Sequence, residues 1–182
     1  MNPRTLASLF LVLSATVLAQ TAAPAPPRNV GQTADFWIAQ VESEVVAAAK
    51  SLPEPKYSFA PVDGQFAGVR TFGEQIKHLA AASYQLGAAT LGEQPPAGTD
   101  HETAPPNVKT KEQIMEYLKG SFTCLHRAAA ALNEQNMNDP IADKGNRTRL
   151  QLMIDAVVHS SNHYGQMVEY LRMNGIVPPA SR

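Results

Sequence analysis

The sequence is poor in cysteine and in clustered charge. Cys124 is the single cysteine among 182 residues, so an internal disulfide is excluded and the fold depends on its hydrophobic core, with or without a metal ion. We expect this thiol to be buried and structural, the alternative being a reactive thiol. The formal net charge is −1, aromatic residues make up 7%, and the chain has no basic block. Nucleic-acid binding therefore has no support, because it needs clustered Lys and Arg.

Long apolar runs are also lacking, except near the beginning of the chain. Residues 1–4 carry a positive charge, residues 6–18 form an apolar run, and Gln20 follows small or modest side chains. This pattern predicts a signal peptide over residues 1–19, cleaved on export to the periplasm or the extracellular space. A transmembrane anchor is the weaker alternative, because a span needs roughly 20 apolar residues. We expect no membrane span after cleavage, and a disordered Ala/Pro-rich lead-in over residues 20–32.

Residues 33–179 are predicted to form one all-α domain without a convincing strand. Apolar residues recur at helical spacing in segments 33–51 and 71–91, in a segment starting at Thr110, and in segment 147–174. Thr33 is the expected N-cap of the first helix, and Thr110 followed by Gln113 is a capping-box pattern. Gly175 is the expected stop of the last helix. Four helices in a domain of this size predict a four-helix bundle.

Two features between and on these helices carry further expectations. The Pro/Gly-rich loop 92–108 is unusually long for a bundle, so we expect it to cover something. The second half of the 71–91 helix is rich in alanine, which permits close packing against a neighbour. That neighbour is either another helix of the bundle or a second copy of the chain in a possible homodimer.

Two histidines near the end of the chain are its most informative pair. His159 and His163 are four residues apart, which places both imidazoles on one face of a helix, about 5–6 Å between Cβ atoms. Two neutral imidazoles so placed can bind one divalent metal ion. The spacing alone also suits a solvated pair or a pair at the edge of the core. No Glu follows the first histidine, so the zinc-protease motif His-Glu-x-x-His is absent.

A third ligand would decide between these alternatives. His78 is the best candidate, because it lies mid-helix beside an apolar face, where burial without a bonding partner costs free energy. His126 is the runner-up and has the pattern of a polar-edge residue. His101 lies in a loop beside Asp100 and Glu102 and is expected to be solvated.

The same residues resemble the landmarks of a known family. His159-x-x-x-His163-Tyr-Gly-Gln166, followed by Tyr-Leu-Arg-x-x-Gly175, resembles the His-x-x-x-His-Arg-Gly-Gln…Leu-Arg-x-x-Gly signature of DinB-like proteins. The run Arg-Thr-Phe-Gly-Glu-Gln-Ile-Lys-His78 resembles the family's helix-two histidine. The resemblance covers most of residues 33–179. It implies a DinB-like up-down-down-up bundle and a divalent metal ion, zinc or nickel, held by His78, His159 and His163. The chain departs from the signature at Tyr164, where the family usually has Arg.

The resemblance also bears on activity. Three imidazoles leave one coordination position open for water or substrate, which is typical of catalytic zinc. Some relatives are thiol-dependent S-transferases or isomerases, and such a transferase acting on a small-molecule substrate is one expectation. Their thiol cofactors are largely cytosolic, so a hydrolase is equally plausible for an exported chain. The alternative is a non-catalytic metal- or ligand-binding bundle, because no nucleophile–base pair is recognisable. Gln166, Asp155 and Glu74 are candidates to orient an imidazole or contact substrate, or are simply solvated side chains.

Overall fold

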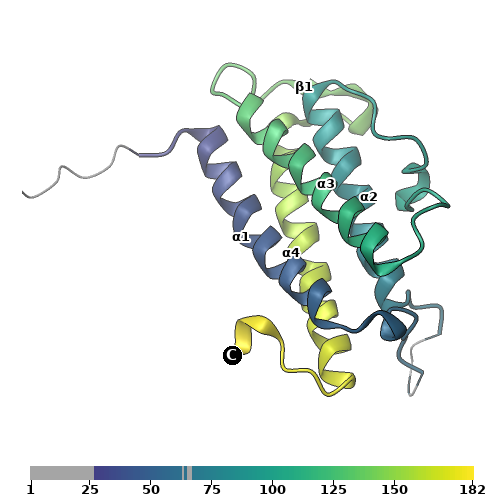
Figure 1. The fold of residues 1–182 in the computed structure, drawn as a ribbon. Helices are drawn as coiled ribbons and strands as arrows, with labels where there is room; N and C mark the ends of the chain where they lie inside the picture. Colours follow the sequence, from purple (N-terminus) through teal and green to yellow (C-terminus); the bar gives the residue numbers. More distant parts are fainter. Residues whose placement is uncertain (1–26, 63, 65–66) are drawn as a thin grey trace, which may run out of the picture.

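The computed structural model describes residues 27–62, 64 and 67–182 (Figure 1). Its four long helices are α1 (Val30–Ser51), α2 (Phe72–Leu91), α3 (Lys111–Ala131) and α4 (Arg149–Met173). Within the described ranges, the only strands are the two-residue β1 (Pro140–Ile141) and β2 (Arg147–Thr148), which pair antiparallel between α3 and α4. The predicted all-α four-helix bundle is therefore confirmed.

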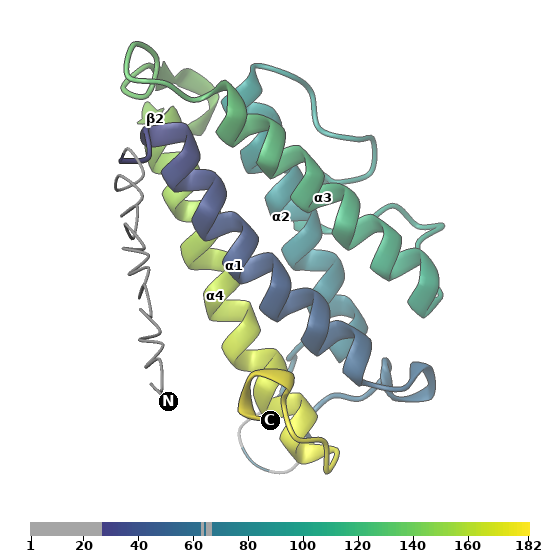
Figure 2. The same cartoon turned by 60° about the vertical axis from the view of Figure 1, so that its left-hand side comes forward.

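The helices follow the expected up-down-down-up order. In Figures 1 and 2, α1 and α4 run side by side in one direction, whereas α2 and α3 run side by side in the other. Each of α1 and α4 also packs against one antiparallel neighbour, α3 and α2 respectively. The α2–α4 contact is the one that matters for the candidate site, because it brings the first half of α2 against the middle of α4.

The parallel arrangement of α2 and α3 explains the long connection between them. A 20-residue helix is about 30 Å long, and α3 must begin at the end of the bundle where α2 began. The chain between Gly92 and Thr110 therefore has to return along the whole bundle, as Figure 1 shows. A short 3₁₀ turn, η2 (Asp100–Glu102), interrupts it and packs against α2.

All four helices begin with a capping box. The capping residues are Asn29, Thr71, Thr110 and Thr148. The expected cap at Thr110 is confirmed, but the expected cap at Thr33 is wrong. Asn29 caps α1 instead, because its side-chain oxygen accepts the Gln32 N–H at 2.8 Å while the Gln32 side chain accepts the Asn29 N–H. Residues 30–32 of the predicted lead-in are consequently helical.

The expected signal peptide over residues 1–19 lies outside the described residues, as do residues 20–26 of the lead-in. In the part of the chain that is described, none of the helices is both long enough and apolar enough to span a bilayer.

The alanine-rich half of α2 is used within the chain. Four of its five alanines are buried, namely Ala80, Ala81, Ala82 and Ala88, and Ala89 is half-buried. Gly87 lies so close to α3 that an added Cβ would sit 2.8 Å from the Cys124 sulfur. Cys124 is buried as expected, and burial raises the pKa of its thiol. These α2 side chains are therefore not a free face for a second copy.

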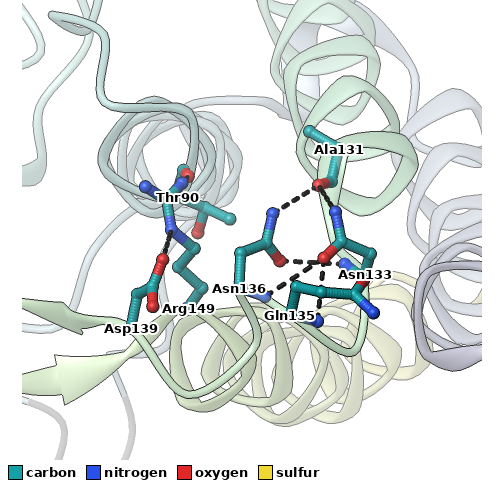
Figure 3. A network of polar contacts seen from close by, with 7 residues as sticks. All are labelled: Thr90, Ala131, Asn133, Gln135, Asn136, Asp139 and Arg149. Atoms are coloured by element: carbon teal, nitrogen blue, oxygen red, sulfur yellow. Dashed lines mark hydrogen bonds and ion pairs between the residues drawn. The ribbon is translucent and has the colours of Figure 1, made fainter.

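A polar network closes the end of the bundle where α3 connects to α4 (Figure 3). The Asn136 side chain donates to the Ala131 carbonyl at 2.8 Å and accepts the Asn133 N–H at 2.9 Å. The Arg149 side chain donates to the Thr90 carbonyl at the end of α2 and lies 3.7 Å from the Asp139 carboxylate. These bonds satisfy carbonyls that the helix ends leave without partners, and they hold the start of α4 against the end of α2.

Candidate metal centre

The three predicted histidines converge between α2 and α4. One ligand atom from each of His78, His159 and His163 can be chosen so that all three atoms lie within 4.8 Å of one another. His78 and His163 are 6% and 8% exposed, and His159 is half-buried. Among the described residues, no cysteine, aspartate, glutamate or further histidine joins this group. The i, i+4 pair on α4 thus acquires a third imidazole from the antiparallel neighbour.

The spacing of the imidazoles suits one shared ion. The Nε2 atoms of His159 and His163 are 3.0 Å apart, and the ring centroids of the three histidines are separated by 4.3 to 5.2 Å. Nitrogen ligands about 2.0–2.1 Å from a tetrahedral zinc ion lie about 3.3–3.4 Å from one another. A small adjustment would therefore bring the rings to ligand distances, and the donor set fits a divalent ion of the zinc type.

The surroundings keep the three imidazoles neutral. Burial lowers the pKa of His163 to about 3, and the neighbouring His159 and His78 add to this effect. Burial is also the main cause that lowers the pKa of His159 and the pKa of His78. A neutral imidazole has a nitrogen lone pair to offer, whereas an imidazolium has none. The cluster is therefore prepared for a cation at neutral pH.

The long connection between α2 and α3 covers His78. The Nδ1 atom of His78 lies 3.2 Å from the backbone carbonyl of Glu102 and 3.4 Å from its carboxylate. A carbonyl can only accept, so this contact places the proton of a neutral His78 on Nδ1 and leaves Nε2 free for a metal. Glu102 adopts φ 54°, in the left-handed region that non-glycine residues seldom occupy. The predicted covering loop is thus found over the site.

A chain of amides backs His163. The Gln75 amide lies 2.8 Å from His163 Nδ1 and also contacts the Gln166 amide. Gln166 in turn contacts the Asn162 side chain at 2.7 Å. The Nδ1 atom of His159, by contrast, is buried and has no hydrogen-bond partner among the described residues.

The other residues considered from the sequence have different roles. Glu74 caps α2 by accepting the Thr71 N–H at 2.8 Å, and Asp155 pairs with Arg147. Gln166 reaches the imidazoles only through Gln75, which the sequence reasoning missed. The sequence could have indicated Gln75, because it precedes His78 by three positions and therefore shares its helix face. Glu102 had no such signal, since its place depends on the path of a long loop.

The runner-up ligand is engaged elsewhere. His126 bonds to Asp35 at 2.6 Å and to Glu42 at 3.0 Å, both on α1. Burial alone would lower the pKa of His126, but the hydrogen bonds and charges of these two carboxylates outweigh it and raise the pKa. His126 is therefore an ion-pairing residue of the α1–α3 contact. The side chain of His101 lies outside the part of the chain that is described.

Comparison with known proteins agrees with this arrangement. The sequence model of the DinB superfamily matches residues 38–167, which include all three histidines. The chain belongs to the DinB superfamily. A solved structure described as the conserved protein of a locus from Enterococcus faecalis superposes with a TM-score of 0.65 at 15% identity. The superposition covers 80% of this chain and 97% of that one, and it supports the fold alone. No curated protein sequence matches the chain.

The departure from the DinB signature lies beside the site rather than in it. Tyr164 is half-buried and packs against the core. Its pKa is raised by burial and by the charge of Glu44 on α1. The three imidazoles form their cluster without it. Tyr in place of the family's usual Arg therefore leaves the three-histidine cluster intact.

Proposed function

We propose that this DinB-superfamily protein binds one divalent metal ion, zinc or nickel, through His78, His159 and His163. We further propose that it uses the ion as a metal-dependent enzyme, a thiol S-transferase-like transferase or a hydrolase. The observation that carries the proposal is the convergence of three neutral imidazoles from two antiparallel helices. Three protein ligands without a fourth, among the described residues, match the pattern of catalytic rather than structural zinc.

When bound, the metal supplies a Lewis acid that lowers the pKa of a water molecule or holds a substrate thiol as thiolate. The residues of the chain hold and orient it. Glu102 fixes the ring proton of His78 on Nδ1, and Gln75 contacts the corresponding nitrogen of His163. Neutral imidazoles leave the full charge of the ion uncompensated, which favours an anionic or ionisable group on the small-molecule substrate.

The first experiment measures the metal and then the activity. Metal content is determined by mass analysis for the wild type and for a variant with His78→Ala, His159→Ala and His163→Ala. We expect one divalent ion per wild-type chain and none in the triple variant, with His126→Ala as the matched control that retains the ion. The proposed site would be contradicted if the purified wild type contained no metal and melted at the same temperature as the triple variant, both with and without added metal.

A screen of thiol transfer and of ester and amide hydrolysis then separates the two enzymatic classes. Loss of one of these activities in the triple variant, with retention in His126→Ala, would assign the class. The second candidate function is a non-catalytic metal- or ligand-binding bundle, structural or sensory. It is favoured by the absence of a recognisable nucleophile–base pair at the cluster in the described part of the chain. Chelation that lowers stability but changes no activity would support it.

We also propose that the protein is exported, on the basis of the pattern in residues 1–19. N-terminal sequencing of the chain from the periplasm or the medium should find a start at Gln20. A variant without residues 2–19 is the control and should stay in the cytosol. A homodimer remains a prediction, for which sedimentation velocity of the purified chain is the direct measurement.

A further inference from the structure

Gln75 is a buried amide that links the cluster to the surface. It is 3% exposed in the first half of α2, and its amide reaches both His163 Nδ1 and Gln166. Gln166 and Asn162 are exposed residues of α4 and extend the chain of contacts to solvent. Burying a polar side chain costs free energy unless it forms hydrogen bonds. The hydrogen bonds of Gln75 are therefore what an apolar residue at this position would lack.

The contacts of the other two histidines bear on where their ring protons lie. His78 carries its proton on Nδ1, because the Glu102 carbonyl opposite that atom can only accept. The Nε2 atoms of His159 and His163 face each other at 3.0 Å, so in the absence of a metal one donates and the other accepts. If His163 is the donor, His159 has its proton on Nδ1 and its Nε2 lone pair toward the cluster.

Which end of the Gln75 amide faces His163 decides which ring nitrogen of His163 carries the proton. When the Gln75 NH₂ group donates to Nδ1, the ring proton of His163 lies on Nε2, and this nitrogen has no lone pair for a metal. Gln75 then also donates to the Gln166 oxygen, and the Gln166 NH₂ group donates to Asn162. When all three amides are reversed, the Gln75 oxygen accepts from Nδ1–H, Gln166 donates to Gln75, and Asn162 donates to Gln166. Every contact is kept with donor and acceptor exchanged.

We propose that Gln75 is the positioning residue of His163: its amide oxygen accepts from Nδ1–H, which turns the Nε2 lone pair toward the metal ion. Gln75 is placed for this role because it is buried and lies 2.8 Å from His163 Nδ1. Gln166 and Asn162 continue the contacts of its amide toward solvent. This inference rests on the proposed metal site.

Two substitutions of Gln75 separate positioning from packing. In Gln75→Glu the carboxylate can only accept, so it should hold the proton on Nδ1 with or without metal. In Gln75→Met the volume is kept and the bond is lost. We expect zinc affinity to fall about 10–100-fold in Gln75→Met and to stay at or above the wild-type value in Gln75→Glu. Gln40→Met, at an exposed position of α1, is the matched control and should bind zinc as the wild type does.

The tautomer is read directly by nitrogen NMR of full-length protein labelled with ¹⁵N-histidine, first chelated and then loaded with zinc. We expect the ring proton of His163 on Nδ1 in the zinc-loaded wild type and in both states of Gln75→Glu. A zinc-loaded wild type with the proton on Nε2 would overturn the proposal, and so would wild-type zinc affinity in Gln75→Met. If wild-type protein bound no zinc, the metal proposal itself would fail, while the metal-free comparison of wild type with Gln75→Glu would still report on Gln75.

Discussion

Zinc should stabilise the folded chain by bridging α2 and α4. The perturbation is addition of zinc to chelated protein, followed by thermal unfolding. His78 is far in sequence from His159 and His163, so the complete three-histidine set exists only in the folded bundle. A ligand that binds only the folded state stabilises it by about 2.7 kcal/mol at a free concentration of about 100 times Kd.

The expected size of the effect follows from the length of the domain. For a domain of about 150 residues, about 1 kcal/mol shifts Tm by roughly 2–4 °C. We therefore expect zinc at about 100 times Kd to raise the Tm of the wild type by roughly 5–11 °C. The shift should grow with the logarithm of the zinc concentration, because binding and folding are linked equilibria.

The control variants make the reasoning refutable. His126→Ala removes a histidine that pairs with α1 instead of joining the cluster, so its zinc-dependent shift should equal that of the wild type. His163→Ala should lose most of the shift, because only one imidazole remains on α4. A shift of equal size in the variant lacking all three cluster histidines would show that zinc acts elsewhere and would refute the bridge.

Three other predictions concern stability and pH. Gly87→Ala should lower the free energy of unfolding by about 1–3 kcal/mol, because the added Cβ would meet Cys124. Gly165→Ala has open space at its Cβ and should raise the free energy of unfolding by about 0.5–1 kcal/mol. Urea unfolding that shows both variants changed in the same direction would contradict this. The folded-state pKa of His126 is raised above the unfolded value of about 6.5, so its stabilisation is fully present below about pH 6.5 and is lost as the pH rises through the folded pKa. His126→Gln should therefore cost more stability at pH 6 than at pH 9, and an equal cost at both would speak against the ion pairs. The lowered pKa values of the three cluster histidines predict that zinc affinity, measured by calorimetry, falls less between pH 7 and pH 6 than it would for three ordinary imidazoles. A fall as steep as that of ordinary imidazoles would contradict this.

Local signals in the sequence predict the fold well. The bundle follows from four segments with helical periodicity, and the start of α3 follows from the Thr110–Gln113 capping box. The expected start of α1 at Thr33 is too late, although Asn29 and Gln32 have the same capping-box spacing as Thr110 and Gln113. The spacing of Asn29 and Gln32 is a local signal that the sequence contains. Thr33 competes with it, because threonine is also a residue type that caps helices.

The sequence predicts the three histidines of the candidate site, but not the residues that contact them from other elements. The i, i+4 spacing places His159 and His163 together, and the family resemblance brings in His78. Glu102 reaches His78 because parallel α2 and α3 force their connection along the bundle, a consequence of topology that residue spacing does not contain. The pairing of His126 with α1 is equally non-local, because it depends on which face of α3 meets α1.

Anomalous X-ray scattering from crystals of protein purified without added metal tests the metal centre most directly. Data collected on both sides of the zinc and nickel absorption edges identify the element and locate it. The three-histidine site predicts a single strong peak about 2.0–2.1 Å from one nitrogen each of His78, His159 and His163. A peak at other residues, or none in crystals of zinc-supplemented protein, would contradict it.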